Sequence, residues 1–224
     1  MPAKPKPRQP LSRERIVDTA LALVDAKGLA ALSMRRLGAE LGMDPMAVYY
    51  YVPNKAALLD AVVEAVMTEI DLGIDDPSQP AEERLVRAAR AYADALVRHR
   101  NALPLLLDRG PATPAALPPV ELMVAILRCG GLSLEQAMAG MHVLTAAVRG
   151  YATIIANEMA DPGHRDTEAL VALASPEEFP YLSEAAAQPR HDPQAAFEFG
   201  LRAIANGLLG SRDAEQHSGC VGTD

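Results

Sequence analysis

The stretch SMRRLGAELGMDPMAVYYY, residues 33–51, decides the fold of the N-terminal part of the chain. Ser33 is a good N-cap for a short helix that ends at Gly42, and Asp44 followed by Pro45 starts another helix after a tight turn. Two short helices joined by a glycine-containing turn fit a helix-turn-helix. In that unit the first helix braces the second, so that the second can enter the major groove of DNA.

The second helix of this unit carries two kinds of side chain. Val48 and Val52 are one turn apart on one face, whereas Met46, Tyr49 and Tyr50 lie toward the other. Consecutive tyrosines suit neither a solvated helix nor a core, because their hydroxyls need partners. DNA would supply phosphate oxygens for the hydroxyls and thymine methyl groups for the rings. The alternative is an ordinary helical hairpin that happens to be basic.

The sequence on both sides of this unit also has the helical period. Apolar residues at helical spacing predict a helix over 13–27, and Asn54 caps a long helix that extends to about residue 71. No segment alternates with the two-residue period of a strand. Further helices are expected over residues 81–100, 120–129, 133–157 and 193–209. We therefore predict an all-α protein.

The same patterns divide the chain into four parts. The N-terminal helices form a helix-turn-helix DNA-binding domain, with the long fourth helix as its link to a helical ligand-binding and dimerisation domain. The expected parts are a flexible basic arm (1–10), the DNA-binding domain (11–71), the ligand-binding and dimerisation domain (72–210) and a disordered tail (211–224).

The charge is divided unevenly between these parts. The whole chain has a formal net charge of -8, which by itself argues against a nucleic-acid partner. Residues 1–60, however, hold nine basic and six acidic side chains, for a net +3, and the other 164 residues hold 12 basic and 23 acidic side chains, for a net -11. A slightly basic N-terminal part and an acidic remainder predict different partners for the two.

Several protein classes do not fit this sequence. No apolar run reaches the about 18 residues that a membrane span needs, and MPAKPKPRQP at the start lacks the apolar core of a signal peptide, so we expect a cytoplasmic protein. Two cysteines are too few for a disulfide framework or a zinc cluster. The enzyme motifs GxSxG, HExxH and the P-loop are absent, which favours a binding protein over an enzyme.

The N-terminal part resembles the DNA-binding domain of the TetR family of bacterial transcriptional repressors. The resemblance extends from Ile16 to Leu59 and is carried above all by MRRLGAELGMDPMAVYYYVPNKAALLDA. Its hallmarks are the pair Tyr49-Tyr50, then Val52, the pair Asn54-Lys55, and Leu58-Leu59. The C-terminal part is similar to the tetracycline-repressor branch, in GGLSLEQA (130–137) and AAFEFGLRAIANGL (195–208).

This resemblance implies a homodimer that pairs through its last two long helices and places two recognition helices on a palindromic operator. Half-sites about 34–36 Å apart are expected for such a dimer. The resemblance also implies a repressor that leaves DNA when a small molecule binds the C-terminal domain. An activator, or a constitutive regulator whose C-terminal domain binds a protein partner, remains the alternative. A stripe of small residues in the last helix suits close helix contact across a dimer: Ala196, Gly200, Ala203 and Gly207.

The resemblance further implies a set of DNA-binding residues. Arg35 lies where the family has an arginine that reaches a base edge, and its fork suits O6 and N7 of guanine. Pro45 and Met46 lie at base-contacting positions but offer no hydrogen-bonding side chain, so readout there would be apolar. Lys55 lies in the first turn of a helix, where it can hold a phosphate. The full set is Met34, Arg35, Pro45, Met46, Ala47, Tyr49, Tyr50, Tyr51 and Lys55.

The effector site departs from the tetracycline repressors. The family's magnesium-chelating histidine would fall among residues 105–107, all leucine, and its pocket glutamine falls at Met123. We therefore expect no metal and no cofactor, and an apolar pocket for an apolar effector, aromatic or polyketide-like. A lone histidine on a helix is more often a packing or surface residue than a ligand contact, and this alternative applies to His99 and His142. The candidate ligand-binding residues are Tyr92, His99, Leu106, Met123, Leu127 and His142.

Overall fold

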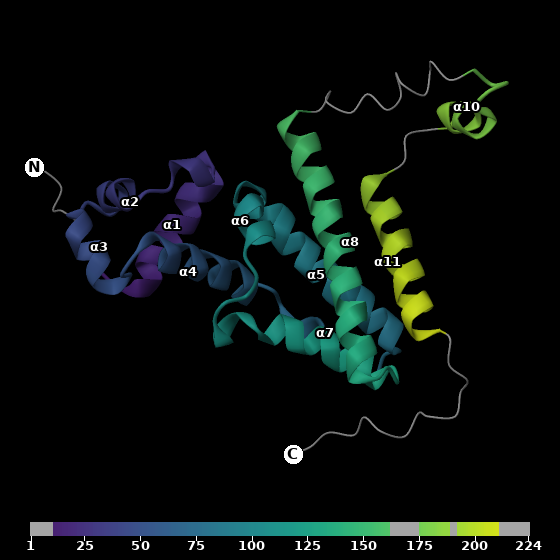
Figure 1. Cartoon of the computed structure of the whole chain (residues 1–224), viewed down its shortest axis with the longest axis horizontal. Coiled ribbons are helices and arrows are strands. Elements are labelled where there is room, and N and C mark those ends of the chain that lie inside the picture. The colour runs from purple at the N-terminus through teal and green to yellow at the C-terminus, as the bar shows by residue number, and fades with distance from the viewer. Residues whose placement is uncertain (1–10, 162–174, 189–191, 211–224) are drawn as a thin grey trace, which may run out of the picture. The chain divides into compact units, whose positions relative to one another are not determined.

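A computed structural model describes residues 11–161, 175–188 and 192–210 (Figure 1). Within these ranges the chain forms α-helices and short 3-10 turns and has no strand, which confirms the all-α prediction. The predicted basic arm and C-terminal tail lie outside the described residues. No helix in the described ranges is long and apolar enough to cross a membrane.

The described residues belong to two compact units. The first unit, which we call the head, contains residues up to Glu69 together with Asn101–Leu117, and the second, the body, contains Ile70–Arg100 and the residues from Pro118 onward. The α-helices of the head are α1 (Arg13–Lys27), α2 (Met34–Leu41), α3 (Pro45–Tyr51), α4 (Lys55–Thr68) and α6 (Leu103–Asp108). The body contains the 3-10 turn η2 (Leu72–Ile74) and the helices α5 (Ala81–Arg98), α7 (Pro118–Cys129), α8 (Leu134–Ala160), α10 (Pro180–Ala186) and α11 (Pro193–Leu209).

The two short helices α2 and α3 of the head each begin at a side chain that accepts a backbone N–H. Ser33 Oγ accepts from Arg36 N at 3.2 Å at the start of α2, and Asp44 Oδ1 accepts from Met46 N at 2.8 Å at the start of α3. Asn54 caps α4 in the same way. These caps satisfy N–H groups that have no partner within the helix, and all three were predicted from the sequence.

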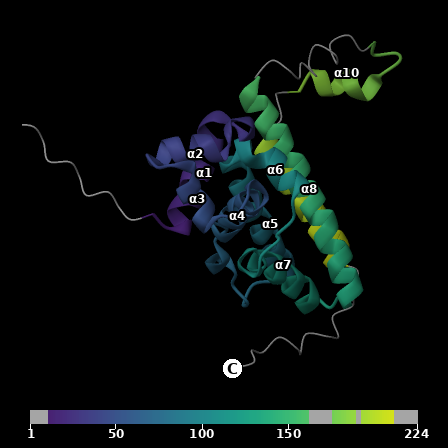
Figure 2. The same ribbon diagram turned by 60° about the vertical axis from the view of Figure 1, so that its left-hand side comes forward.

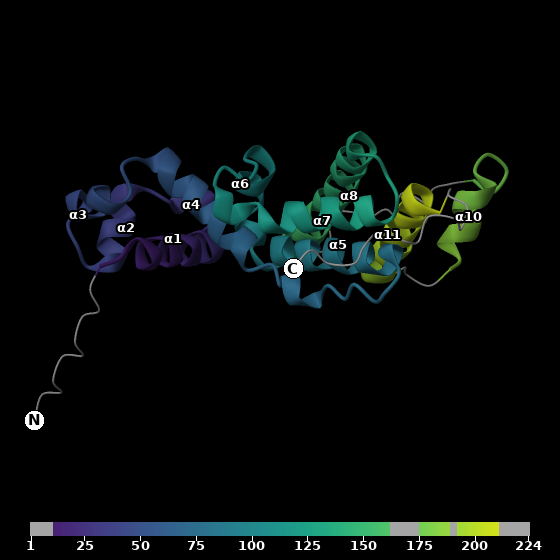
Figure 3. The same cartoon turned by 90° about the horizontal axis from the view of Figure 1, so that it is seen from below.

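The head is held together by a small apolar core. Side chains from four helices are fully buried at its centre. Helix α1 packs against both α2 and α4, as Figure 3 shows from below. The fully buried residues include Ile16, Leu37, Val48 and Leu58. Burial of such side chains supplies the main favourable term for a domain of this size.

Residues 101–117 fold with the head although α5 of the body precedes them in the chain. Asn101 Nδ2 donates to the backbone carbonyl of Asp25 at 2.6 Å, and the guanidinium of Arg109 pairs with the carboxylate of Asp60 on α4. Ala116 is fully buried. The predicted domain ranges are continuous in sequence, whereas the head is not, because this segment packs against α4.

The body is built around α5, which packs against α7, α8 and α11. Figures 1 and 2 show α8 and α11 running side by side. Ser133 and Gln136 form the predicted capping box at the start of α8, with bonds of 3.2 and 2.9 Å. The interior is filled by leucines that are fully buried or nearly so, including Leu85, Leu96, Leu127, Leu144 and Leu201.

Several helix ends differ from the prediction, among them that of α5, which ends at Arg98 rather than at residue 100. Helix α4 ends at Thr68 rather than near residue 71, because the Asp71 carboxylate accepts from Gly73 N at 2.8 Å and so caps the following turn, η2. Helix α8 continues past Asn157 to Ala160. Sequence periodicity locates a helix better than its ends, which depend on such local hydrogen bonds.

Candidate nucleic-acid interface and effector site

Helix α3 presents an apolar and aromatic surface to the outside of the head. Val48 and Val52 are buried beneath it, while Met46 is 72% exposed and Tyr50 is 87% exposed. Tyr49 is also exposed, and the rings of Tyr50 and Tyr51 lie edge to face with their centroids 5.3 Å apart. Large exposed side chains on one short helix indicate a binding surface, and the two faces are those predicted from the sequence.

Gly38 allows α2 to lie close to the turn that precedes α3. A Cβ atom at this position would be 3.0 Å from the carbonyl oxygen of Met43 and 3.1 Å from the nitrogen of Pro45. Gly42 ends α2 with a φ of 68°, a left-handed conformation that glycine adopts readily. The two glycines therefore fix the angle between α2 and α3, and with it the direction in which α3 is presented.

Cationic side chains flank this surface. Arg35 on α2 and Lys55 at the start of α4 are exposed, and neither has an ion-pair partner among the described residues. Lys27 differs, because its Nζ lies 3.3 Å from Oε1 of Glu40. Arg35 and Lys55 thus keep their charge available for an anionic partner, and their contact with DNA stays a prediction.

The remaining predicted DNA-binding residues are less uniform. Pro45 and Ala47 are half-buried, and Tyr51 is exposed. Met34 is only 7% exposed and packs in the core of the head, so its side chain cannot reach DNA in this conformation. Met34 is the first residue of α2. Its place in the sequence matches a DNA-contacting position of the family, but its side chain turns toward the core.

The body has a small hollow between η2, α5 and α7. Its walls are mainly apolar, with Leu72 and Ile74 from η2, Ala88 and Ala91 from α5, and Leu122 from α7. Two of the predicted ligand-binding residues, Tyr92 and Met123, also line it. The room that it offers to a bound molecule in this conformation is about 10 Å³, which is about the size of one water.

Comparison with known proteins identifies the family. The family model described as bacterial regulatory proteins of the tetR family matches residues 16–62, and the model of the tetracycline repressor-like C-terminal domain matches residues 76–211. The chain belongs to the TetR family. It is therefore a DNA-binding transcriptional regulator and not an enzyme.

Individual TetR-family proteins support this placement over most of the chain. The HTH-type transcriptional repressor DrrR1 of Streptomyces coeruleorubidus is 29% identical, covering 90% of this chain and 78% of that protein. The class C tetracycline repressor of Escherichia coli is 30% identical, covering 88% and 90%. The crystal structure of apo ActR from Streptomyces coelicolor is similar with a TM-score of 0.80 and 32% identity, covering 90% of this chain and 96% of that one.

The structure does not gather the other predicted ligand-binding residues around the hollow. His99 is buried at the end of α5, and Leu127 is fully buried in the core of the body. Leu106 is buried within the head. His142 is exposed on α8. Of the six candidates, Tyr92 and Met123 line this hollow and the other four do not. Helical spacing alone does not say toward which neighbour a side chain points.

A contact that the sequence did not predict lies beside the hollow of this TetR-family body. Arg149 on α8 donates through Nε to the hydroxyl of Tyr92 on α5, with a distance of 3.1 Å. The two residues are 57 positions apart. No periodicity or motif signals such a pair, so it could have been found only from the folded arrangement.

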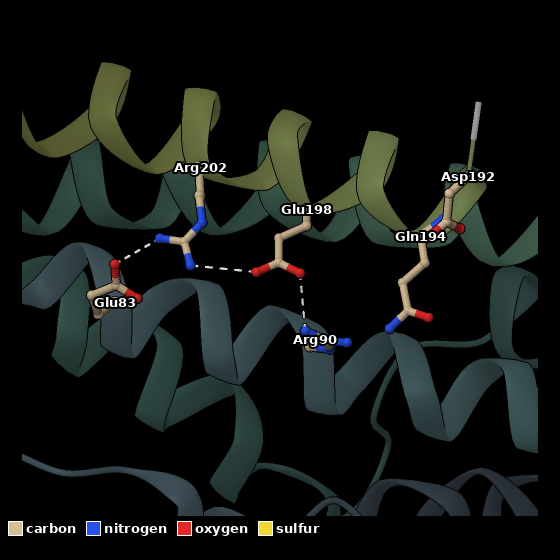
Figure 4. Close-up of polar contacts among 6 residues, drawn as sticks. All are labelled: Glu83, Arg90, Asp192, Gln194, Glu198 and Arg202. Atoms are coloured by element: carbon tan, nitrogen blue, oxygen red, sulfur yellow. Dashed lines mark hydrogen bonds and ion pairs between the residues drawn. The ribbon is translucent and has the colours of Figure 1, made fainter. Parts of the chain in front are cut away.

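Charged residues fasten α11 to α5 (Figure 4). Arg202 of α11 lies between Glu83 of α5, at 2.6 Å, and Glu198, at 3.3 Å. Glu198 also pairs with Arg90 of α5 at 3.0 Å. The hydrogen bond with Glu83 is the main cause that raises the pKa of Arg202. The side chains of these pairs are more than one-third exposed, so each pair contributes little to stability by itself.

The outward faces of α8 and α11 are apolar or small. Phe199 is 77% exposed, and a Cβ atom added at Gly200 or Gly207 would meet nothing within 4 Å. On α8, Met138, His142, Ala146, Gly150 and Ile154 recur at every fourth position and are all exposed. The small residues predicted to mediate helix contact therefore lie on a surface that the described residues leave uncovered.

Proposed function

We propose that this TetR-family regulator is a homodimeric repressor that binds a palindromic operator and is released by a small effector. The observation that carries the proposal is the exposed surface of α3, with Met46 and Tyr50 outward and unpaired Arg35 and Lys55 beside it. Its side chains offer the two kinds of contact that a major groove accepts, apolar contact with thymine methyls and hydrogen bonds or charge contacts with guanine and phosphate.

The uncovered face of α8 and α11 supports the homodimer. It combines exposed apolar side chains, such as Phe199 and Ile154, with the open positions at Gly200 and Gly207. Small residues permit two helices to approach closely, and burial of the larger ones against a second copy would remove apolar area from water. A dimer would hold two copies of α3 at one fixed separation, which a palindrome requires.

The effector proposal rests on the hollow of the body. Solved structures of ActR include a complex with actinorhodin, and the hollow of the present chain has mainly apolar walls. Helices α5 and α7 both line the hollow, and residues 101–117 connect them in the chain. These connecting residues pack against α4 in the head. Displacement of α5 or α7 by an effector would therefore shift α4 and alter the spacing of the two recognition helices. By linkage, DNA and effector would weaken each other's binding by the same factor.

Gel-shift and transcription assays test this proposal. We expect the full chain to shift its own promoter region only when a palindrome is present, and to repress transcription from it. A body-surface variant, Gly200→Glu, should elute as a monomer in size-exclusion chromatography with light scattering and lose the shift, because it places a charge in the proposed contact. Activation of transcription would favour an activator. A gel shift that no compound in a library of aromatic molecules reverses would favour a constitutive regulator whose C-terminal domain binds a protein partner.

A further inference from the structure

Two large side chains, Met46 and Tyr50, form the outermost part of α3. They are 72% and 87% exposed and lie about one helical turn apart on the same face. The ring of Tyr51 lies edge to face against that of Tyr50, with centroids 5.3 Å apart, which favours one orientation of the Tyr50 ring. Met46 and Tyr50 thus make an outward surface of thioether, methylene and ring atoms, which we call the α3 ridge.

The two polar side chains at the ends of α3 are already used as helix caps. Asp44 Oδ1 accepts from the backbone N–H of Met46 at 2.8 Å. Asn54 Oδ1 accepts from the backbone N–H of Ala57, also at 2.8 Å. In the major groove a carboxylate reads the amino group of cytosine, and an amide reads adenine through its oxygen and nitrogen together. With both oxygens committed to backbone, the sequence of α3, PMAVYYY, leaves the tyrosine hydroxyls as its strong hydrogen-bonding groups.

The major groove contains one apolar group, the C5 methyl of thymine. Cytosine has a hydrogen at C5, whereas 5-methylcytosine has the same methyl as thymine beside the amino group of cytosine. A surface of thioether and ring atoms can gain from burying this methyl, but it cannot tell the O4 of thymine from the amino group of cytosine. Removal of one methyl from water is worth about fourfold in affinity.

We propose that the α3 ridge selects bases by their C5 methyl group and accepts 5-methylcytosine in place of thymine. The inference rests on the proposed function and deepens it by naming the chemical group that α3 recognises in the operator. Met46 and Tyr50 bury the methyl against sulfur, methylene and ring atoms. Binding of the operator therefore responds to methylation of cytosine at C5 wherever a cytosine lies under the ridge.

Replacement of thymine by uracil tests the methyl contact without changing the hydrogen-bonding edges. The promoter region that the full chain shifts is amplified once with dTTP and once with dUTP, and both fragments are titrated by fluorescence anisotropy. We expect the uracil fragment to bind at least about fifteenfold more weakly, which is about fourfold from each of two half-sites.

Four bases at one position then separate the methyl from the polar edge. Each pyrimidine of the operator is made thymine, uracil, 5-methylcytosine or cytosine in both half-sites, with the matching purine opposite. At the position under the ridge, thymine and 5-methylcytosine should bind with similar affinity, and uracil and cytosine about fifteenfold more weakly. The preference would thus follow the methyl group and not the hydrogen-bonding edge.

Variants of the ridge show whether the preference comes from α3. The double variant Met46→Ala with Tyr50→Ala should bind the thymine and uracil fragments equally, because it lacks the apolar atoms. Tyr50→Phe loses only the hydroxyl and should keep the full preference. Met159→Ala makes the same change as Met46→Ala on an exposed methionine of α8 and should also keep it. Melting curves by circular dichroism show whether the variants are folded, and the parent chain on the four bases decides if the double variant is not.

The outcomes separate this inference from the proposed function. Equal affinity of the parent chain for thymine and uracil DNA overturns the inference, and so does a methyl preference that the folded double variant keeps. Affinities that pair thymine with uracil and 5-methylcytosine with cytosine would show that a tyrosine hydroxyl reads the edge, which also overturns it. A shift of the thymine fragment without methyl preference leaves the proposed function intact, whereas no shift of the promoter region overturns the proposed function.

Discussion

The head and the body fix their helices in different ways. In the head, α2 and α3 have eight and seven residues, and each begins at a cap that acts over two or three positions of the chain. In the body, α8 and α11 have 27 and 17 residues, and contacts such as Arg90 with Glu198 join positions 108 residues apart. The recognition surface is thus specified locally, whereas the body depends on partners that are distant in the sequence.

The largest effect should come from a change in the packing of α2 against the turn. Gly38→Val places side-chain atoms where a Cβ alone would be 3.0 Å from backbone. Because backbone cannot yield as a flexible side chain does, we expect a loss of about 3 kcal/mol in the free energy of unfolding of the head, and loss of operator binding. Thermal unfolding and gel shifts measure both. Ala39→Val, at the exposed neighbouring position, is the matched control, and equal behaviour of the two variants would contradict the local specification.

A second prediction concerns recognition without a change in folding. Arg35→Ala should weaken operator binding by about 2 kcal/mol and relax preference at one base pair, because a bidentate contact to guanine would be lost. The adjacent exposed Arg36 provides the control: Arg36→Ala should weaken binding less and equally for all sequences. Fluorescence anisotropy with single-base operator variants measures this. An Arg35→Ala variant that binds as the parent does would remove Arg35 from the interface.

A smaller effect is expected in the body. Glu198→Gln removes the carboxylate shared by Arg90 and Arg202, and all three side chains are between about one-third and one-half exposed. Solvent and salt screen such pairs, so the melting temperature should fall slightly at low salt and hardly at high salt. Glu135→Gln, on an exposed glutamate of α8 without an ion pair among the described residues, is the control. A fall in melting temperature that is the same at low and high salt would indicate that Glu198 acts through packing rather than through its charge.

The smallest effect should be visible only at alkaline pH. The ring of Tyr151 stacks on Phe197 with centroids 3.8 Å apart, and burial, followed by the charge of Asp94, raises the pKa of Tyr151. The folded state therefore holds the phenol proton longer than the unfolded state, and this stability is lost as pH rises through the folded pKa. The melting temperature of Tyr151→Phe should fall less steeply than that of the parent above about pH 10. Parallel curves for the two proteins would contradict the shift.

The sequence predicted those features that depend on neighbouring residues. The caps at Ser33, Asp44 and Asn54, the box at Ser133, and the buried and exposed faces of α3 are all present in the structure. Each arises from a residue type acting on backbone a few positions away, so a single sequence carries the information.

The features that the sequence did not predict depend on distant contacts or on the direction of a side chain. Tyr92 with Arg149 and Asp60 with Arg109 are 57 and 49 positions apart, and no periodic pattern marks either pair. Met34 is buried because its side chain turns into the core, which its place at the start of a helix does not reveal. A sequence motif therefore predicts the location of a recognition helix well. It predicts less well which side chains of that motif are exposed to contact DNA.

The return of residues 101–117 to the head has a consequence for synthesis of the protein. The carbonyl of Asp25 and the carboxylate of Asp60 gain their partners Asn101 and Arg109 only when this later segment has been translated. Domains generally fold as units, in the order in which they leave the ribosome, but this head cannot complete its contacts until all of α5 has also emerged. A fragment ending at Glu69 would therefore lack the contacts that residues 101–117 make with the head. We expect it to be less stable than the same residues in the full chain.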